Sequence, residues 1–572
     1  MRIAPAAYRK KMKSQIKRLS KLRTSYEAGD SCEKLEILRS IREIELQTNR
    51  DLQELHSTLC FIRAFPDTVA HYRAAHSILL GFESRVRKLR VNESTKLWDT
   101  GIAGTPVHYP FSFEVACWLA SHASGTATID WDEVDDTSRL DELLEQLLLP
   151  SEADYFDSGL VSSQEWLELA AGGSGAVSFD WLLAQSQQAR FLSVWTQLYN
   201  AAELPLTWNL GSTAYSKSHN IVPHQTLVAR KNGLRKKVFA PKSEVMRPLE
   251  KLEQVSARKG AGLIDVAMAS LAVRHRETFH FNYANPKEVY IADAGQGISI
   301  VIFGLQPENR YPLECTMGYL IVSNGSPVGY GGASALFRQI NTGVNIFDEY
   351  RGSEAAYLWI QVMRVYHHLF GCTRFIANAF QFGGDNAEAL QSGAFWFYYR
   401  LGYRPVLASV RKLAVREAQR IRRNGSYRCN LAVLRRLASC DMHLTLPGAR
   451  ASELFEERWI ETSSMLATQE LAAAGGATRT ESADRVSTQV ARDLGFRSVS
   501  DWSADEKRAY RQLAPIVAAA TPANWPLAAK RSMRTLLRAK GGLLEAKYAR
   551  LLREHTHFLS ALRSGCQAAE KQ

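Results

Sequence analysis

The sequence predicts an α+β protein in which a central mixed sheet is flanked by mostly helical regions. Residues 1–90 and the chain beyond residue 408 repeat apolar side chains every three or four positions, which is the period of an α-helix. Between about 288 and 347 the pattern changes to short apolar runs separated by Gly, Pro and Asn, which is typical of strands and hairpins. Hydrophobic residues at 46% and charged residues at 23% are usual for a globular protein, and they exclude a wholly disordered or collagen-like chain.

The length and the changes of texture along the chain predict four structural regions. A chain of 572 residues is long enough for several domains of roughly 100–200 residues each. We expect a basic helical region, an acidic and mostly helical domain, a strand-rich central domain and a C-terminal helical domain. Their predicted bounds are 1–95, 96–221, 222–447 and 448–572.

Charge is distributed unevenly along this chain, whose formal net charge is +13. Residues 1–25 contain nine Lys or Arg and no acid, whereas residues 91–180 contain seventeen Asp or Glu against two basic residues. Two interpretations are open. The basic segments bind a polyanion or a protein partner, or they pack against the acidic region of the same chain and are neutralised by it. Further basic clusters occur at 230–242, 404–436 and 530–553.

The sequence gives no sign of secretion, of a membrane span or of a metal site. The basic N-terminus has no apolar stretch behind it, and runs such as 298–305 fall far short of the roughly 20 residues that span a bilayer. Eight scattered cysteines form no CxxC pair, so we expect reduced thiols and a cytoplasmic protein. The acidic run 130–136 lacks the spacing of a calcium loop. We therefore expect no metal cofactor.

The central region is predicted to alternate strands and helices in a definite order. Asn324-Gly325 separates two apolar runs and predicts a tight hairpin turn. A helix is expected between a fourth and a fifth strand, with another helix after the fifth. The predicted strands are 225–230, 236–240, 288–293, 297–305, 315–322, 327–336, 343–347, 374–380 and 442–446, and the predicted helices are about 248–278, 354–370 and 385–401.

The segment Arg351–Ala356 (RGSEAA) opens the predicted helix 354–370. The first turn of a helix presents unpaired backbone N–H groups and the positive end of the helix dipole, so it can hold a phosphate group. Small residues such as Gly352 and Ser353 allow the backbone to approach such a ligand closely. Arg351 adds a cation.

This order of elements, with its motifs, resembles the GNAT acyltransferase superfamily. In that family the loop after the fourth strand reads Arg/Gln-x-x-Gly-x-Gly/Ala. Here Arg351 takes the first place and Ala356 the last, while Glu354 stands where the family has Gly. Asn386-x-x-Ala and the run 397–403 (FYYRLGY) are similar to the family's later Asn-x-x-Ala and Phe-Tyr-x-x-Leu-Gly-Phe. The resemblance covers about 222–447.

The resemblance implies an acyl group that is carried on CoA, as acetyl-CoA or another acyl-CoA, and moved to an amine acceptor. In the family the pantetheine arm adds to the open edge between the splayed fourth and fifth strands. A Tyr at the place of Tyr398 protonates the departing thiolate, and Glu354, Glu349 or Asp348 could take the proton from the amine. The residues that the resemblance places at the cofactor are Val344, Ile346, Arg351, Gly352, Ser353, Ala355, Ala356 and Asn386.

Each of the main site residues also has a purely structural interpretation. Glu354 could cap the first helical turn, where an acid is favoured, or pair with Arg351. Arg351 could form a surface ion pair with Asp348 or Glu349. Tyr398 could be part of an aromatic core, because residues 395–399 read FWFYY.

Three hypotheses for the function follow from the sequence. The first is an acyl-CoA-dependent N-acyltransferase. The second is a non-catalytic scaffold with a GNAT-like fold, in which Glu354 marks a lost cofactor site. The third is a transferase whose acceptor is linked to a nucleic acid held by the basic segments, which would make binding fall steeply with salt.

Overall fold

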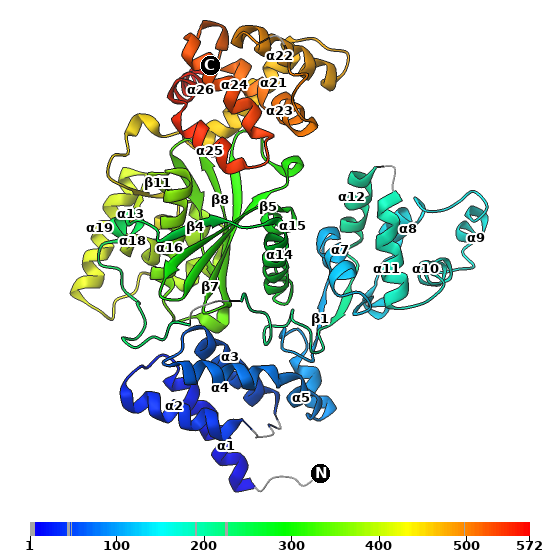
Figure 1. Ribbon diagram of the computed structural model, residues 1–572, viewed down its shortest axis with the longest axis vertical. Helices are drawn as coiled ribbons and strands as arrows, with labels where there is room; N and C mark the ends of the chain where they lie inside the picture. Colours follow the sequence, from blue (N-terminus) through cyan, green and yellow to red (C-terminus); the bar gives the residue numbers. More distant parts are fainter. Residues whose placement is uncertain are drawn as a thin grey trace.

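The computed structural model describes residues 6–42, 46, 48–188, 191–223, 227–496 and 498–571. The chain is α+β, with one large mixed sheet at its centre and helical units around it (Figure 1). The N-terminal helices lie at one end of this sheet and the C-terminal helices at the other, while an acidic unit projects to one side (Figure 1). Within these described ranges, no helix combines the length and apolar character needed to cross a membrane.

The N-terminal unit is a bundle of helices that packs on the hairpin predicted at Asn324-Gly325. The hairpin is confirmed: both residues have positive φ, 46° and 81°, as its tight turn requires. Its tip is buried, because Ser323 Oγ and Asn324 Nδ2 donate to the backbone oxygen of Ala64 at 2.7 and 2.9 Å. The helices are α1 (Ala6–Leu22), α2 (Ala28–Ile41), α3 (Asn49–Ala64), α4 (Val69–Leu80), α5 (Phe82–Arg87) and α6 (Val91–Ser94).

The acidic unit contains a small sheet that the sequence analysis missed. Three strands pair in the order β1-β3-β2, around which six helices pack. Short strands of three or four residues give too few positions for a period to be recognised. The strands are β1 (Pro106–Tyr109), β2 (Ala127–Ile129) and β3 (Leu206–Asn209), and the helices are α7 (Phe113–His122), α8 (Ser138–Leu144), α9 (Ala153–Asp157), α10 (Ser163–Ala171), α11 (Ala176–Gln185) and α12 (Leu192–Ala202).

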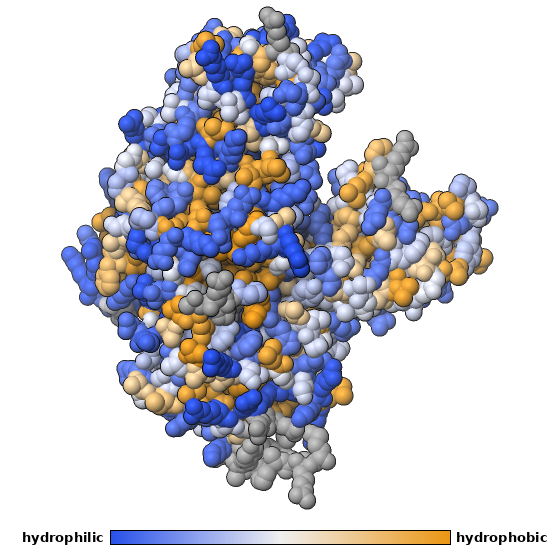
Figure 2. Space-filling model, viewed as in Figure 1, coloured by the Kyte–Doolittle hydropathy of each residue, from blue (hydrophilic) through white to orange (hydrophobic). Residues whose placement is uncertain are grey.

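The acidic unit does not neutralise the basic segments of the chain. Between described residues, the ion pairs of its carboxylates are with Lys96, His108, Arg139 and His275. None of these partners belongs to the four basic segments. The unit stands out as a separate lobe (Figures 1 and 2). Neutralisation by the acidic region is therefore wrong for the described residues. Several cations of the basic segments pair instead with other carboxylates, such as Arg18 with Glu33, Arg420 with Glu417 and Lys540 with Glu545.

The described strands of the central unit form one ten-stranded sheet in the order β12-β13-β11-β9-β8-β7-β6-β5-β4, with β10 paired to β8. The one parallel pair is β9 with β11. A parallel pair needs a crossover connection, which here is helix α16 (Ala355–Phe370). The strands are β4 (Lys251–Gln254), β5 (Ala284–Gly295), β6 (Ile298–Leu305), β7 (Cys315–Ser323), β8 (Ser326–Leu336), β9 (Gln339–Thr342), β10 (Asn345–Ile346), β11 (Arg374–Ala377), β12 (Arg404–Pro405) and β13 (Met442–Thr445).

Helices cover both faces of the central sheet. Neighbouring residues of β7 point to opposite faces: Tyr319 packs against Tyr366 of α16, with ring centroids 6.1 Å apart, and Gly318 lies against His280 of α15. Helix α13 packs on α16 (Figure 1). The other helices of this unit are α13 (Pro241–Met246), α14 (Ala257–Ala272), α15 (Phe279–Asn282), α17 (Ala387–Ser392), α18 (Phe395–Arg400), α19 (Ala408–Arg423) and α20 (Leu431–Leu437).

Several predicted elements of the central unit are wrong. Residues 236–240 are an exposed loop instead of a strand, and the predicted strand at 225–230 lies partly outside the described residues, while 227–230 form no strand. The helix predicted over 248–278 is divided into β4 and α14. The helix predicted over 385–401 is broken into α17 and α18 by Gly393, which has a φ of 67° and ends α17 in the left-handed conformation.

The C-terminal helices are joined to the sheet by a buried network of charges. Arg310 pairs with Glu288 of β5 at 3.1 Å and lies 3.8 Å from Glu545, which also pairs with Lys540. All four side chains are almost fully buried. Arg310 also donates to the backbone oxygens of Lys540 and Gly542. The helices are α21 (Arg458–Ala473), α22 (Arg479–Leu494), α23 (Ala504–Ala519), α24 (Leu527–Lys540), α25 (Glu545–Glu554) and α26 (Thr556–Ala569).

Removing Arg310 should destabilise the protein strongly. The change Arg310→Met leaves Glu288 and Glu545 buried with one fewer counter-charge, and breaking a buried pair in this way costs about 3–5 kcal/mol. The exposed pair Arg511–Asp484 provides the control, because Arg511→Met should cost at most about 1 kcal/mol. Urea denaturation followed by tryptophan fluorescence measures both. Equal shifts of the two midpoints would contradict the role assigned to Arg310.

Candidate functional site

The strand predicted at 343–347, which corresponds to the fourth strand of the family that the sequence resembles, belongs to an interrupted strand. Thr342 pairs with Ala333 and Asn345 with Tyr330, so β9 and β10 continue on β8 in the same register. Gly343 and Val344 lie between the two strands and are not paired with β8. The predicted strand 343–347 is therefore the second half of one broken strand. Such a break exposes backbone N–H and C=O groups within a sheet that is otherwise paired.

The break lies where β9 and β11 diverge. Their parallel pairing covers three residue pairs and ends at Asn341 with Ile376. Beyond this point β10 stays on β8, whereas the chain after β11 turns into a short helix at Ala379–Phe382. The two strands predicted to splay thus part at the break. Among the described strands β10 pairs with β8 alone, so its other edge could take an extended ligand by β-augmentation.

The Tyr398 hydroxyl lies at this break. The backbone N–H of Val344 hydrogen-bonds to the hydroxyl, and burial raises the pKa of Tyr398 above its usual range. The ring packs edge-on against Trp359 of α16 and Tyr403, with centroids 6.4 and 5.4 Å away. On the same face of the sheet, Tyr319 donates to the backbone oxygen of Gly343. Tyr398 therefore belongs to the core and also places a polar group at the strand break.

One side chain lies over the strand break. A Cβ added at Gly343 would collide with the amide of Gln381, because this half-buried amide lies directly over the glycine. The far end of a glutamine can rotate away, whereas a backbone segment could not. Gln381 was not among the predicted site residues, and no motif of the sequence marks it.

A pair of carboxyl groups lies across the same divergence and was also missed. Asn341, the last paired residue of β9, donates to Glu457 at 3.3 Å. The backbone N–H of Ala379, where the chain leaves β11, donates to Asp441 at 3.0 Å. Glu457 is on the surface and lies beside Asp441; its partial burial, and then the Asp441 charge, raise the pKa of Glu457 to about 7. The two acids come from segments far along the chain, so no local spacing could reveal them.

Glu354 forms neither of the contacts that the sequence suggested. Its carboxylate is 1% exposed and pairs with Arg230 at 3.2 Å, while the N–H of Arg235 donates to it at 2.9 Å. It makes no side-chain capping bond to the first turn of α16, and Arg351 pairs elsewhere. Glu354 thus fixes the segment around 230–235 over the start of α16, and it points away from the backbone of the phosphate-type loop.

The other residues of the predicted phosphate loop lie together before α16. Arg351 is exposed and pairs with Asp348 at 2.8 Å and Glu388 at 3.1 Å, so the surface ion pair of the sequence analysis is present. Gly352 has a φ of 84°, which favours glycine. The Ser353 side chain is 6% exposed and its hydroxyl has no hydrogen-bond partner among the described residues. Ala355 and Ala356 form the first turn, half-buried.

The remaining predicted site residues are divided between the two ends of the site. Val344 belongs to the strand break, and Ile346 lies in β10 just after it. Asn386 caps α17, since its Oδ1 accepts the N–H of Ala389 at 3.0 Å. Among the described residues, no group of three or more His, Cys, Asp or Glu is placed to hold a metal ion.

Glu349 lies away from the break, in a buried ion-pair triad. It contacts Lys217 at 3.1 Å and Arg274 at 3.4 Å. Burial alone would raise the pKa of Glu349, but Arg274 and Lys217 outweigh it and hold the pKa well below its usual range. A carboxylate of such low basicity is a weak proton acceptor at neutral pH. The triad instead joins the loop before α16 to the acidic unit and to α14.

Comparison with known proteins gives no match from which a function could be inferred, so the function is argued from the arrangement of the site residues. No protein-family model, no curated protein and no solved structure matches this chain.

The triad should make stability depend on pH in a defined direction. Because the folded-state pKa of Glu349 is lowered, its contribution is complete above its ordinary value of 4.5 and is lost as the pH falls below it. Glu349→Gln strands two buried cations, and we expect a loss of about 3–5 kcal/mol at neutral pH. Urea denaturation at several pH values tests this. The difference between wild type and variant should shrink below about pH 4.5, and a constant difference would contradict the triad.

Proposed function

We propose that the central unit is an acyltransferase that takes its acyl group from an acyl-CoA, such as acetyl-CoA, and passes it to an amine. One observation carries the proposal: the break at Gly343–Val344, beside two diverging parallel strands, with the Tyr398 hydroxyl on the Val344 amide. The arrangement supplies a free strand edge for an extended pantetheine arm and a proton donor beside the place where a thioester would end.

In this proposal Tyr398 is the general acid. The Tyr398 hydroxyl is protonated at neutral pH, as tyrosines ordinarily are, and can give its proton to a departing thiolate. The amine nitrogen forms the new bond to the acyl carbon while the carbon–sulfur bond breaks. The backbone N–H of Val344 stabilises the negative charge left on the Tyr398 oxygen until the proton is replaced.

The pair Glu457–Asp441 is the proposed base. A group with a pKa of about 7 is half deprotonated near neutral pH and suits proton removal from an attacking amine. Glu349 and Glu354 are less suited to act as the base, because each carboxylate forms a buried ion pair, with Lys217 and Arg230 respectively. Asp348 is exposed and paired with Arg351.

The start of α16 is the proposed site for the pyrophosphate of the acyl-CoA. Arg351 and the unpartnered Ser353 hydroxyl would contact the phosphates, together with the backbone of Gly352, Ala355 and Ala356. Because Gln381 covers Gly343, the proposal requires this side chain to rotate when pantetheine binds.

Two specific observations favour other functions. The Gln381 amide over the break and the carboxylate of Glu354 buried near the loop favour a scaffold with no cofactor site. Exposed cations of the basic segments that form no ion pair with a described residue, such as Lys236 and Lys237, favour an acceptor linked to a polyanion. Binding of such an acceptor would weaken steeply with added salt.

Tyr398→Phe should lower kcat while leaving acyl-CoA binding nearly unchanged. Loss of a general acid costs roughly 100-fold or more in rate. Release of free thiol from acetyl-CoA in the presence of a panel of primary amines gives the rate, and calorimetry gives the affinity. Tyr510→Phe changes a buried tyrosine of the C-terminal unit and serves as the control. If the wild type binds no acyl-CoA at millimolar concentrations, the scaffold function is supported instead.

Glu457→Gln should change the pH dependence of the reaction. With a pKa of about 7, the wild-type pair accepts a proton only as the pH rises through that value, so kcat should rise over the same interval. In the variant, kcat should no longer rise as the pH passes through about 7, and most of the activity should be lost. Glu461→Gln lies one turn further along α21 and should keep this rise. A profile shared by wild type and Glu457→Gln would exclude Glu457 as the base.

A further inference from the structure

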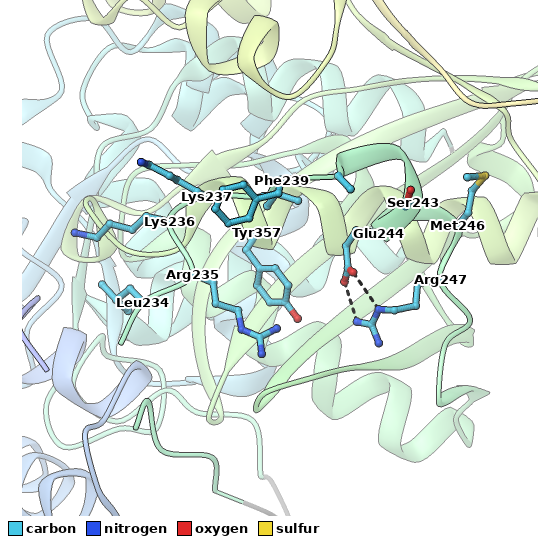
Figure 3. A pocket seen from close by; sticks show the side chains of 12 residues that line it. Leu234, Arg235, Lys236, Lys237, Phe239, Ser243, Glu244, Met246, Arg247 and Tyr357 are labelled. Atoms are coloured by element: carbon cyan, nitrogen blue, oxygen red, sulfur yellow. Dashed lines mark hydrogen bonds and ion pairs between the residues drawn. The ribbon is translucent and has the colours of Figure 1, made fainter. Parts of the chain in front are cut away.

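A second cavity lies on the other flank of α16. It has a volume of about 900 Å³ and is lined mainly by residues 234–247, which precede β4, together with Tyr357 of the first turns of α16 (Figure 3). Cavities of roughly 300–1,000 Å³ are usual for small-molecule sites. The segment is held in place by Glu354, which binds Arg230 and the backbone of Arg235.

The lining of this cavity is strongly basic. Four cations and one carboxylate line it, and the carboxylate, Glu244, is bound to Arg247 at 2.8 Å. Arg235, Lys236 and Lys237 are exposed and form no ion pair with a described residue. In Figure 3, Arg235 extends below the Tyr357 ring while the two lysines reach outward at the rim. Unpaired cations around a cavity attract a multiply charged anion.

One buried polar group of the cavity has no partner. The Tyr357 side chain is 4% exposed, yet its hydroxyl makes no hydrogen bond among the described residues. The hydroxyl points into the space between Arg235 and the Arg247–Glu244 pair (Figure 3). An unpaired buried hydroxyl costs about 1–3 kcal/mol, and a ligand with an acceptor oxygen would remove that cost.

The cavity also offers an aromatic surface. Phe239 is 94% exposed and lines the cavity together with the cations and Tyr357 (Figure 3). At this exposure the face of the ring is free for an aromatic ligand to stack on. Nucleobases stack on such rings, with about 1–3 kcal/mol per base.

We propose that this cavity binds a nucleoside that carries two or more phosphates, with its base on Phe239 and its phosphates among Arg235, Lys236, Lys237 and the Tyr357 hydroxyl. The site is separate from the strand break. Tyr357 and Trp359 are two positions apart on α16 and thus point to nearly opposite sides of it, and Trp359 is the residue that contacts Tyr398. The nucleoside phosphate is either a free nucleotide or the nucleotide end of CoA.

Calorimetric titration of the full chain with ADP and with ATP tests the site. Saturable binding is expected, with the Kd rising roughly tenfold in Tyr357→Phe because one hydrogen bond is lost. The double variant Lys236→Ala/Lys237→Ala should weaken binding further and reduce its dependence on salt. Lys287→Ala removes an exposed lysine of β5 and should bind as the wild type does. Tyr398→Phe, which tests the acyl site, should also bind ADP normally, so the two proposals fail separately.

Competition distinguishes the source of the ligand. If CoA and 3′,5′-ADP displace ADP while pantetheine does not, the cavity holds the nucleotide end of CoA. If CoA does not compete, it holds a free nucleotide. Absence of saturable ADP and ATP binding at millimolar concentrations would overturn the site. Equal affinity for ADP and inorganic pyrophosphate, unchanged in Phe239→Ala, would overturn the assignment of a nucleoside.

Discussion

The single parallel pair of the central sheet is the constraint on which the rest of this structure depends. Because β9 and β11 run in the same direction, the chain between them must cross over the sheet, and α16 is that crossing. The crossing places the start of α16 beside the end of the broken strand. It also lets the two strands part after three residue pairs. An antiparallel partner for β9 would have needed no crossing helix and could have continued along this edge.

Buried charges, more than apolar contacts alone, fix how the units meet around this sheet. Arg310 with Glu288, Glu545 and Lys540 joins the C-terminal helices to β5, and Glu349 with Lys217 and Arg274 joins the loop before α16 to its neighbours. Desolvating such groups is expensive, so they are poor sources of net stability. Their geometry is demanding, however, and a wrong arrangement leaves charges unpaired. They therefore favour one relative position of the units.

The sequence predicted the parts of the fold that carry a local signal. The hairpin at Asn324-Gly325 follows from two residues that accept positive φ, and α16 from an apolar stripe over 354–370. The strand break could not be predicted, because Gly343 and Val344 form no local sequence pattern that distinguishes them from paired strand residues. The break is visible only in how the folded chain pairs with β8. Of the candidate site, Tyr398 was proposed from its motif, and its role stays a prediction. Glu457 and Asp441 were not proposed, since only the folded sheet brings them to Asn341 and Ala379.

Glu354 shows why a departure from a motif needs the structure to be understood. In the sequence, a carboxylate in a phosphate-type loop suggests repulsion of the ligand. In the structure, the carboxylate forms an ion pair with Arg230 and accepts a hydrogen bond from the backbone N–H of Arg235. These two contacts hold the segment 230–247 beside α16. That segment brings Arg235, Lys236 and Lys237 to the flank of the helix. Glu354 therefore positions the cations of the proposed nucleotide site beside the same helix whose start is the proposed pyrophosphate site.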